Sequence, residues 1–189
     1  MKIAFCAAMA LALVGASMTQ AQQASDPGQG MPGGGPQGAP RGPRTPDVVA
    51  PSIPIDLAVA AAKAAQAACA SFHFGVAILD QSGQAKLFYT TDGASGDHAT
   101  RAAGKASAAL LINAPSEGLK DRAAADPAIA AKVQAAKDSG KPLMGMAGGL
   151  PIVANGQVLG AIGVSGAEPG GHDKECATAA LNAIQGQLK

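Results

Sequence analysis

Apolar residues recur at helical spacing in several alanine-rich stretches of this chain. Between Asp56 and Phe72, positions such as Val59, Ala62 and Cys69 follow the period of about 3.6 residues that is typical of an amphipathic helix. An aspartate near the start of three later stretches can cap a helix or supply an anion to its first turn. These further helices are predicted over residues 97–112, 126–138 and 173–188.

Shorter apolar stretches between the predicted helices indicate strands. Residues 74–80 and 85–90 form one pair of such stretches, around the turn-forming residues 81–84. Asn155-Gly156 lies between two apolar, β-branched runs, and because both residues accept a positive φ it predicts a two-residue type I′ turn. A further short strand is predicted over Pro142–Ala147, which brings the expected number of strands to five.

Glycines are frequent in the strands around this turn. They occupy positions 160, 163 and 166 of the second strand, and Gly148-Gly149 precedes the first. Glycine weakens a strand, so the usual reasons for it are a bulge or the close approach of another backbone or a flat ligand. The pattern predicts a thin surface, poor in side chains, on which a planar molecule can lie.

The predicted elements follow the order α-β-β-α-α-β-β-β-α. Because tight turns join neighbouring strands, we expect an α+β fold with a mostly antiparallel five-stranded sheet flanked by helices. The first and last helices are expected on one face, where Cys69 and Cys176 can meet. The sequence does not give their separation, so a disulfide and two reduced buried cysteines are both open alternatives.

The first 21 residues have the features of a signal peptide. Lys2 precedes an apolar run, and Thr19-Gln20-Ala21 offers the small residues that signal peptidase requires. Residues 22–54, rich in Gly and Pro, are predicted to be a disordered linker, which leaves a globular domain over 55–189. The apolar run after Lys2 is shorter than the roughly 20 residues that span a bilayer and no second such run follows, so we expect a periplasmic or secreted chain without membrane insertion.

Composition and motifs argue against two classes of function. The formal net charge is +1 and the chain has no tryptophan, so the basic and aromatic surfaces of nucleic-acid-binding proteins are not expected. Ser165 lacks the G-x-S-x-G spacing of hydrolases, and neither Cys69 nor Cys176 belongs to a Cys-x-x-Cys motif. The sequence therefore predicts a protein that is not an enzyme.

A series of short motifs runs through the predicted domain. They are Asp80 with Gly83, Lys105-Ala106, Asn113–Pro115, Gly148–Ile152, Gly160–Gly166 and Pro169–Gly171. In this order and at this spacing they resemble the GlcG/HbpS family of haem-binding proteins. The resemblance implies a profilin-like fold, homo-oligomers, haem as cofactor and, in some members, a membrane sensor kinase as partner. The family's second helix often carries a threonine where this chain has Ala108, so that contact is not carried over.

Haem requires an apolar slot, a cation for its propionates and an axial ligand such as His or Met. His98 lies seven residues before Lys105, about two helical turns, so a metal ligand and a propionate partner are expected on one face. Met144 and Met146 alternate along a predicted strand, and either iron ligation or core packing accounts for them. The predicted haem site consists of His98, Lys105, Met144, Met146, Gly148, Gly149 and Pro151.

These inferences predict an exported haem-binding protein that captures, stores or senses haem without turnover. One alternative is an enzyme, or an enzyme accessory, that acts on a small organic acid. A second alternative is an interaction module in which the glycine-rich strand serves subunit packing.

Overall fold

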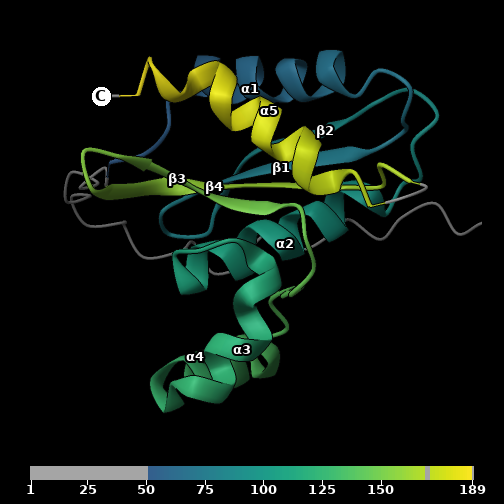
Figure 1. The fold of residues 1–189 in the computed structure, drawn as a ribbon. Coiled ribbons are helices and arrows are strands. Elements are labelled where there is room, and N and C mark those ends of the chain that lie inside the picture. Colours follow the sequence, from purple (N-terminus) through teal and green to yellow (C-terminus); the bar gives the residue numbers. More distant parts are fainter. Residues whose placement is uncertain (1–50, 169–170, 189) are drawn as a thin grey trace, which may run out of the picture. The chain divides into compact units, whose positions relative to one another are not determined.

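The computed structural model describes residues 51–168 and 171–188 (Figure 1). The chain divides into residues 1–45 and 46–189, and the described residues all belong to the second unit. The predicted signal peptide, and the predicted linker up to residue 50, lie outside them. The helices are α1 (Ile55–Ala68), α2 (His98–Ile112), the 3₁₀ turn η1 (Ser116–Gly118), α3 (Leu119–Ala125), α4 (Pro127–Asp138) and α5 (Asp173–Gln185). The strands are β1 (Gly75–Asp80), β2 (Ala85–Thr90), β3 (Gly149–Ala154) and β4 (Gln157–Ser165).

Within the described residues the strands form one antiparallel sheet in the order β2-β1-β4-β3. The expected antiparallel sheet flanked by helices is confirmed, but the expected number of five strands is wrong, since the sheet has four. The central strands β1 and β4 are almost wholly buried, whereas β2 at the edge alternates between exposed and half-buried positions. The turn at Asn155-Gly156 has φ values of 50° and 76°, as a type I′ turn requires.

The missing fifth strand is the segment Pro142–Ala147. Pro142 has no N–H to donate to a sheet, and the N–H of Met144 donates to the Gly104 carbonyl of α2 at 2.9 Å. The backbone of this segment therefore bonds to α2 and does not pair with the edge strand β3.

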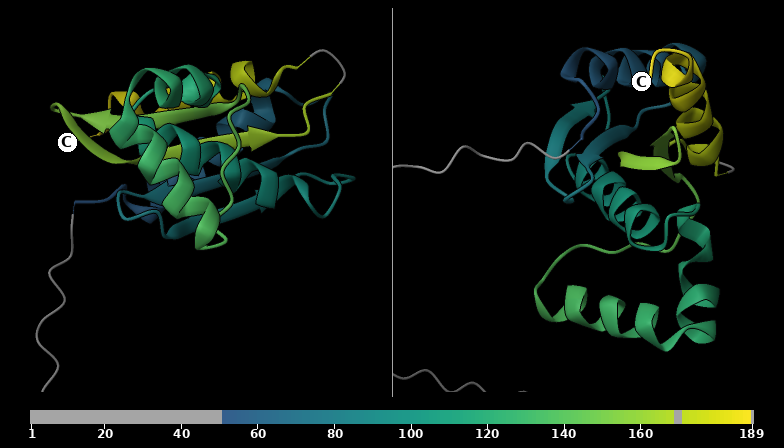
Figure 2. Two further views of the ribbon diagram at one scale, coloured as in Figure 1. Left: turned by 90° about the horizontal axis from the view of Figure 1, so that it is seen from below. Right: turned by 90° about the vertical axis from the view of Figure 1, so that its left-hand side faces the viewer.

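The helices form layers on the two faces of the sheet (Figures 1 and 2). α1 and α5 lie side by side on one face, and α2 covers the other. Cys69, which follows α1, and Cys176 of α5 form a disulfide with a Cα–Cα distance of 5.9 Å, which decides between the two alternatives left open by the sequence. α3, which was not predicted as a helix, and α4 extend beyond α2 on the side away from the sheet.

The thin surface predicted from the glycines exists, and α2 of the same chain lies on it. A Cβ added at Gly163 would collide with the Ala102 carbonyl oxygen, and one at Gly149 with the Lys105 carbonyl. The close approach of another backbone, one of the usual reasons for strand glycines, therefore accounts for Gly149 and Gly163. The α2 helix fills the space in which a planar ligand was expected to lie.

Candidate functional site

Lys105 of the predicted haem site is buried and paired. Its Nζ lies 2.5 Å from Asp173 Oδ2, and the exposed fractions of the two side chains are 2% and 8%. Asp173 Oδ1 accepts a hydrogen bond from the Ala167 N–H at 2.8 Å. The prediction that the Asp173 side chain caps α5 is wrong, because the carboxylate is used inside the fold. The Lys105 charge is already compensated by a residue of its own chain.

Gly148 and Gly149 pack against this region. Gly148 has φ 113°, and a Cβ there would lie 2.7 Å from Asp173 Cβ. The N–H of Gly149 donates to Ser116 Oγ at 2.9 Å. Pro151 is half-buried on the edge strand β3. The two glycines are thus in contact with their own chain on the side where a ligand was expected.

His98 is the first residue of α2, and its ring lies against Gly166. Its Nδ1 is buried and has no hydrogen-bond partner among the described residues. At a rise of about 1.5 Å per residue, His98 lies about 10 Å from Lys105 along the helix axis. Its role as an iron ligand stays a prediction.

The two methionines do not share a strand face, because their segment is not a strand. Met144 is half-buried beside Gly104 of α2. Met146 is 53% exposed, and its carbonyl accepts a hydrogen bond from Ser116 Oγ at 2.5 Å.

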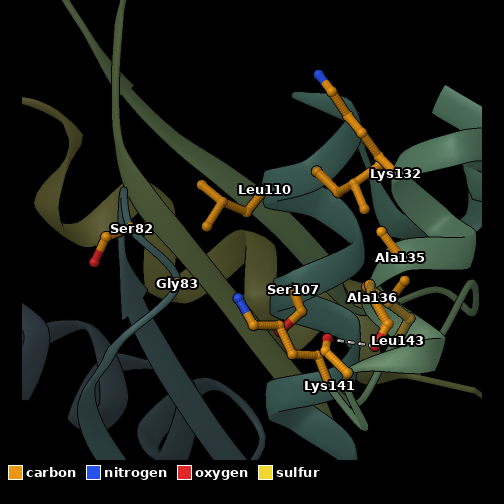
Figure 3. Close-up of a pocket in the computed structure, with 11 residues that line it drawn as sticks. Ser82, Gly83, Ser107, Leu110, Lys132, Ala135, Ala136, Lys141 and Leu143 are labelled. Carbon is orange, nitrogen blue, oxygen red and sulfur yellow. Dashed lines mark hydrogen bonds between the residues drawn. The ribbon is translucent and has the colours of Figure 1, made fainter. Parts of the chain in front are cut away.

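A groove that the sequence did not indicate lies between α2, α4 and the β1–β2 turn (Figure 3). Its volume is about 360 Å³, within the range of about 300–1,000 Å³ that is common for small-molecule sites. We call it the α2–α4 groove. It is lined by Ser82, Gly83, Ser107, Leu110, Leu111, Lys132, Ala135, Ala136, Ser139, Lys141 and Leu143.

An adjoining cleft extends the groove toward the edge strand β2. The cleft has a volume of about 260 Å³ and shares Ser82, Gly83, Ser107 and Lys141 with the α2–α4 groove. Its far end is formed by Phe88, whose exposed fraction of 54% is high for a large apolar residue. The lining of the groove thus continues from the helices to the edge strand β2.

The chemistry of the groove is apolar and cationic. Leucine and alanine supply five of its eleven lining residues, and Lys132 and Lys141 are its charged residues. Within residues 51–168 and 171–188 neither lysine forms an ion pair with a carboxylate. The arrangement suits an amphipathic anion, with apolar faces for the groove and carboxylates for the lysines.

Asp80 fixes the turn at one rim of the groove. Its Oδ1 accepts hydrogen bonds from the Ser82 N–H at 2.9 Å, the Ser82 hydroxyl at 2.6 Å and the Gln84 N–H at 2.9 Å. Partial burial raises the pKa of Asp80, but these hydrogen bonds and the charge of Lys86 together lower that pKa below its usual value. The Asp80 carboxylate therefore stays ionised and holds Ser82 and Gly83 in place.

A larger cleft, of about 600 Å³, lies along α5, and its described lining residues include no unpaired cation to bind an anion. Its lysine, Lys174, is already paired with Glu117 at 2.6 Å. Glu175, which also lines this cleft, adds a negative charge. In the part of the chain that the structure describes, the α2–α4 groove and its extension toward Phe88 combine unpaired lysines with apolar walls, which the cleft along α5 does not.

A family model described as "Haem degrading protein HbpS-like" matches residues 53–182. The chain belongs to the HbpS-like family. The resemblance derived from the short motifs is thereby confirmed, and the family relates the chain to haem.

Solved structures agree with membership of the HbpS-like family. A double mutant of Streptomyces reticuli HbpS is 30% identical, with a TM-score of 0.60, over 79% of this chain and 99% of that chain. Two other solved structures show the same fold. ORFY of Klebsiella pneumoniae is 20% identical, with a TM-score of 0.61, over 75% of this chain and 96% of that chain. A PduOC:haem complex is 21% identical, with a TM-score of 0.59, over 70% of this chain and 95% of that chain. No curated protein matches the chain.

None of the described helices of the HbpS-like chain is both long and apolar enough to cross a membrane. No group of three or more His, Cys, Asp or Glu side chains within the described residues is arranged to hold a metal ion.

Proposed function

We propose that this HbpS-like protein binds haem in the α2–α4 groove and does so without chemical turnover. The observation that carries the proposal is the pairing of apolar walls with two lysines that have no carboxylate partner in the described structure. Leu110, Leu111 and Leu143 offer contacts to the macrocycle, and the lysines offer charge to its propionates. Haem, when bound, would supply its iron for redox or ligand-binding chemistry.

Binding without turnover is proposed because of the side chains around the groove. Among its lining residues the two lysines are the groups that can transfer a proton, and no Asp, Glu, His, Cys or Tyr stands beside them. Capture, storage or redox sensing of haem is therefore a better fit than its degradation. A homo-oligomer and a membrane sensor kinase that receives a signal stay predictions from the family resemblance.

We further propose that the protein acts outside the cytoplasm, in the periplasm or after secretion. The signal peptide predicted over residues 1–21 is the first support. The Cys69–Cys176 disulfide is the second, because disulfides persist mainly in oxidising compartments.

Titration of residues 22–189 with hemin tests the proposal and distinguishes the two candidate sites. We expect a saturable Soret shift that Ser107→Trp abolishes, because Ser107 lines both parts of the groove and an indole there fills it. His98→Ala should leave the shift unchanged. If His98→Ala removes the shift and Ser107→Trp does not, haem binds at the site predicted from the sequence. A protein that gives no saturable shift does not bind haem.

A further inference from the structure

The α2–α4 groove has an unusual set of side chains for a haem site. Haem iron in proteins is held by His, Cys, Met or Tyr. None of these residue types occurs among the lining residues of the groove or of its extension toward Phe88. The groove does supply hydroxyl groups, but its only charged side chains are lysines.

The two lysines that line the groove come from two neighbouring segments of the chain. Lys132 belongs to α4, and Lys141 follows its C-terminal turn, where the Lys141 N–H donates to the Ala136 carbonyl at 2.9 Å. Figure 3 shows their ammonium groups on either side of Leu110 in that view. Two cations that line one groove together with Leu110 match a ligand that carries carboxylates on an apolar body.

We infer that the groove recognises a porphyrin by its apolar ring and its carboxylates and not by its metal. This inference rests on the proposed function. It implies that metal-free protoporphyrin binds about as tightly as its iron complex, since neither Lys132 nor Lys141 contacts the metal in such recognition. It also implies that a porphyrin whose carboxylates are esterified binds weakly.

Fluorescence and absorbance titrations of residues 22–189 test this with three ligands: protoporphyrin IX, hemin and protoporphyrin IX dimethyl ester. We expect dissociation constants for the first two that agree within about threefold, and a constant for the ester that is at least about tenfold larger. Lys132→Ala and Lys141→Ala should each weaken both acids by about fivefold, the upper end for one exposed ion pair. Lys137→Ala is the matched control, because Lys137 is exposed on α4 and does not line the groove.

The outcomes separate the inference from the proposed function. If hemin binds and protoporphyrin IX binds more than about tenfold more weakly, the metal is recognised and the inference is wrong while haem binding stands. The inference is equally wrong if both acids bind and the two lysine variants match Lys137→Ala. If neither acid binds to protein whose circular dichroism shows it folded, the proposed function fails together with the inference.

Discussion

At the scale of the residue, Lys105 and Asp173 carry opposite charges that are both withdrawn from water. Removing both charges from solvent is costly, and the ion pair repays that cost only while both partners are present. The sequence pointed to Lys105 as a functional cation, because it lies about two helical turns after His98 and belongs to a motif that resembles the haem-binding family. It could not show that Asp173, 68 positions away, supplies the counter-charge.

Asp173→Ala is therefore expected to destabilise the protein strongly. The change leaves the buried Lys105 ammonium without a partner, which costs about 3–5 kcal/mol of unfolding free energy. Urea denaturation followed by circular dichroism measures the loss. Glu175→Ala, on the same turn of α5 but exposed and bonded only to His172, should change the stability by less than about 1 kcal/mol. Equal effects of the two variants would contradict the role given to the pair.

Asp80 contributes stability that depends on pH. Its pKa in the folded protein lies below the unfolded value, so its stabilising effect is present above about pH 4 and is lost as pH falls through the folded pKa. Asp80→Asn keeps an acceptor oxygen but removes the charge. We expect the variant to be less stable than wild type at pH 7 and the difference to shrink as the pH falls below about 4. Denaturation at several pH values checks this, and a difference that is independent of pH would refute it.

At the scale of the element, α2 depends on the glycines of the strands beneath it. The sequence showed where these glycines are, and it allowed either a ligand or another backbone to approach them. The sequence could not distinguish a ligand from another backbone, because both can approach only where side chains are absent. The segment 142–147 was misjudged for a related reason: its short apolar pattern suits a strand, but Pro142 and the hydrogen bond of Met144 to Gly104 hold it against α2.

Gly163→Ala should disrupt the contact between α2 and the sheet. The new methyl group meets the backbone of Ala102, which cannot rotate away, so we expect a loss of about 1–3 kcal/mol. Gly96→Ala is the control, since a Cβ at Gly96 has nothing within 4 Å, and it should stay within about 0.5 kcal/mol of wild type. Thermal and urea unfolding of both variants provide the measurement. A neutral Gly163→Ala would show that α2 can move away at no cost.

The disulfide joins α1 and α5, elements that pack as neighbours on one face. It links residues that are 107 positions apart, so it restricts a long loop of the unfolded chain. Replacing both cysteines by alanine should lower the unfolding free energy by about 2–4 kcal/mol. Comparison of the variant with the oxidised protein in urea tests this, and a loss below about 1 kcal/mol would mean that helix packing alone holds the two elements.

At the scale of the whole molecule, most of the layered fold could be predicted and the groove could not. Helical and strand periodicity depend on neighbouring residues, so most elements and the type I′ turn were found from the sequence. The groove is assembled from Ser82-Gly83, from α2 and from residues 132–143. Gly83 and α2 belong to the short family motifs, but those motifs do not indicate that the three segments meet around one groove. Only the fold brings them together, and α3, which carries α4 away from the sheet, was itself not predicted as a helix.

α4 has no fully buried residue, so its contacts with the rest of the protein are weak. If hemin binds between α2 and α4, hydrogen exchange in residues 127–138 should slow by about tenfold at a ligand concentration about ten times the dissociation constant. α5 lies on the opposite face of the sheet and is the internal control. Equal slowing in α4 and α5, or none in α4, would place the ligand elsewhere.

The contact of α2 with Gly163 and Gly149 has a consequence for how a guest molecule is accommodated. A helix whose backbone touches the sheet cannot retreat, so one wall of the groove is rigid. The opposite wall is a single helix tethered at its two ends, by Asp126-Pro127 and by Gly140, whose φ is 70°. Ligands of different thickness can then be accommodated only by a shift of α4. The loops at the two ends of α4 are therefore the positions where substitutions would change ligand selectivity.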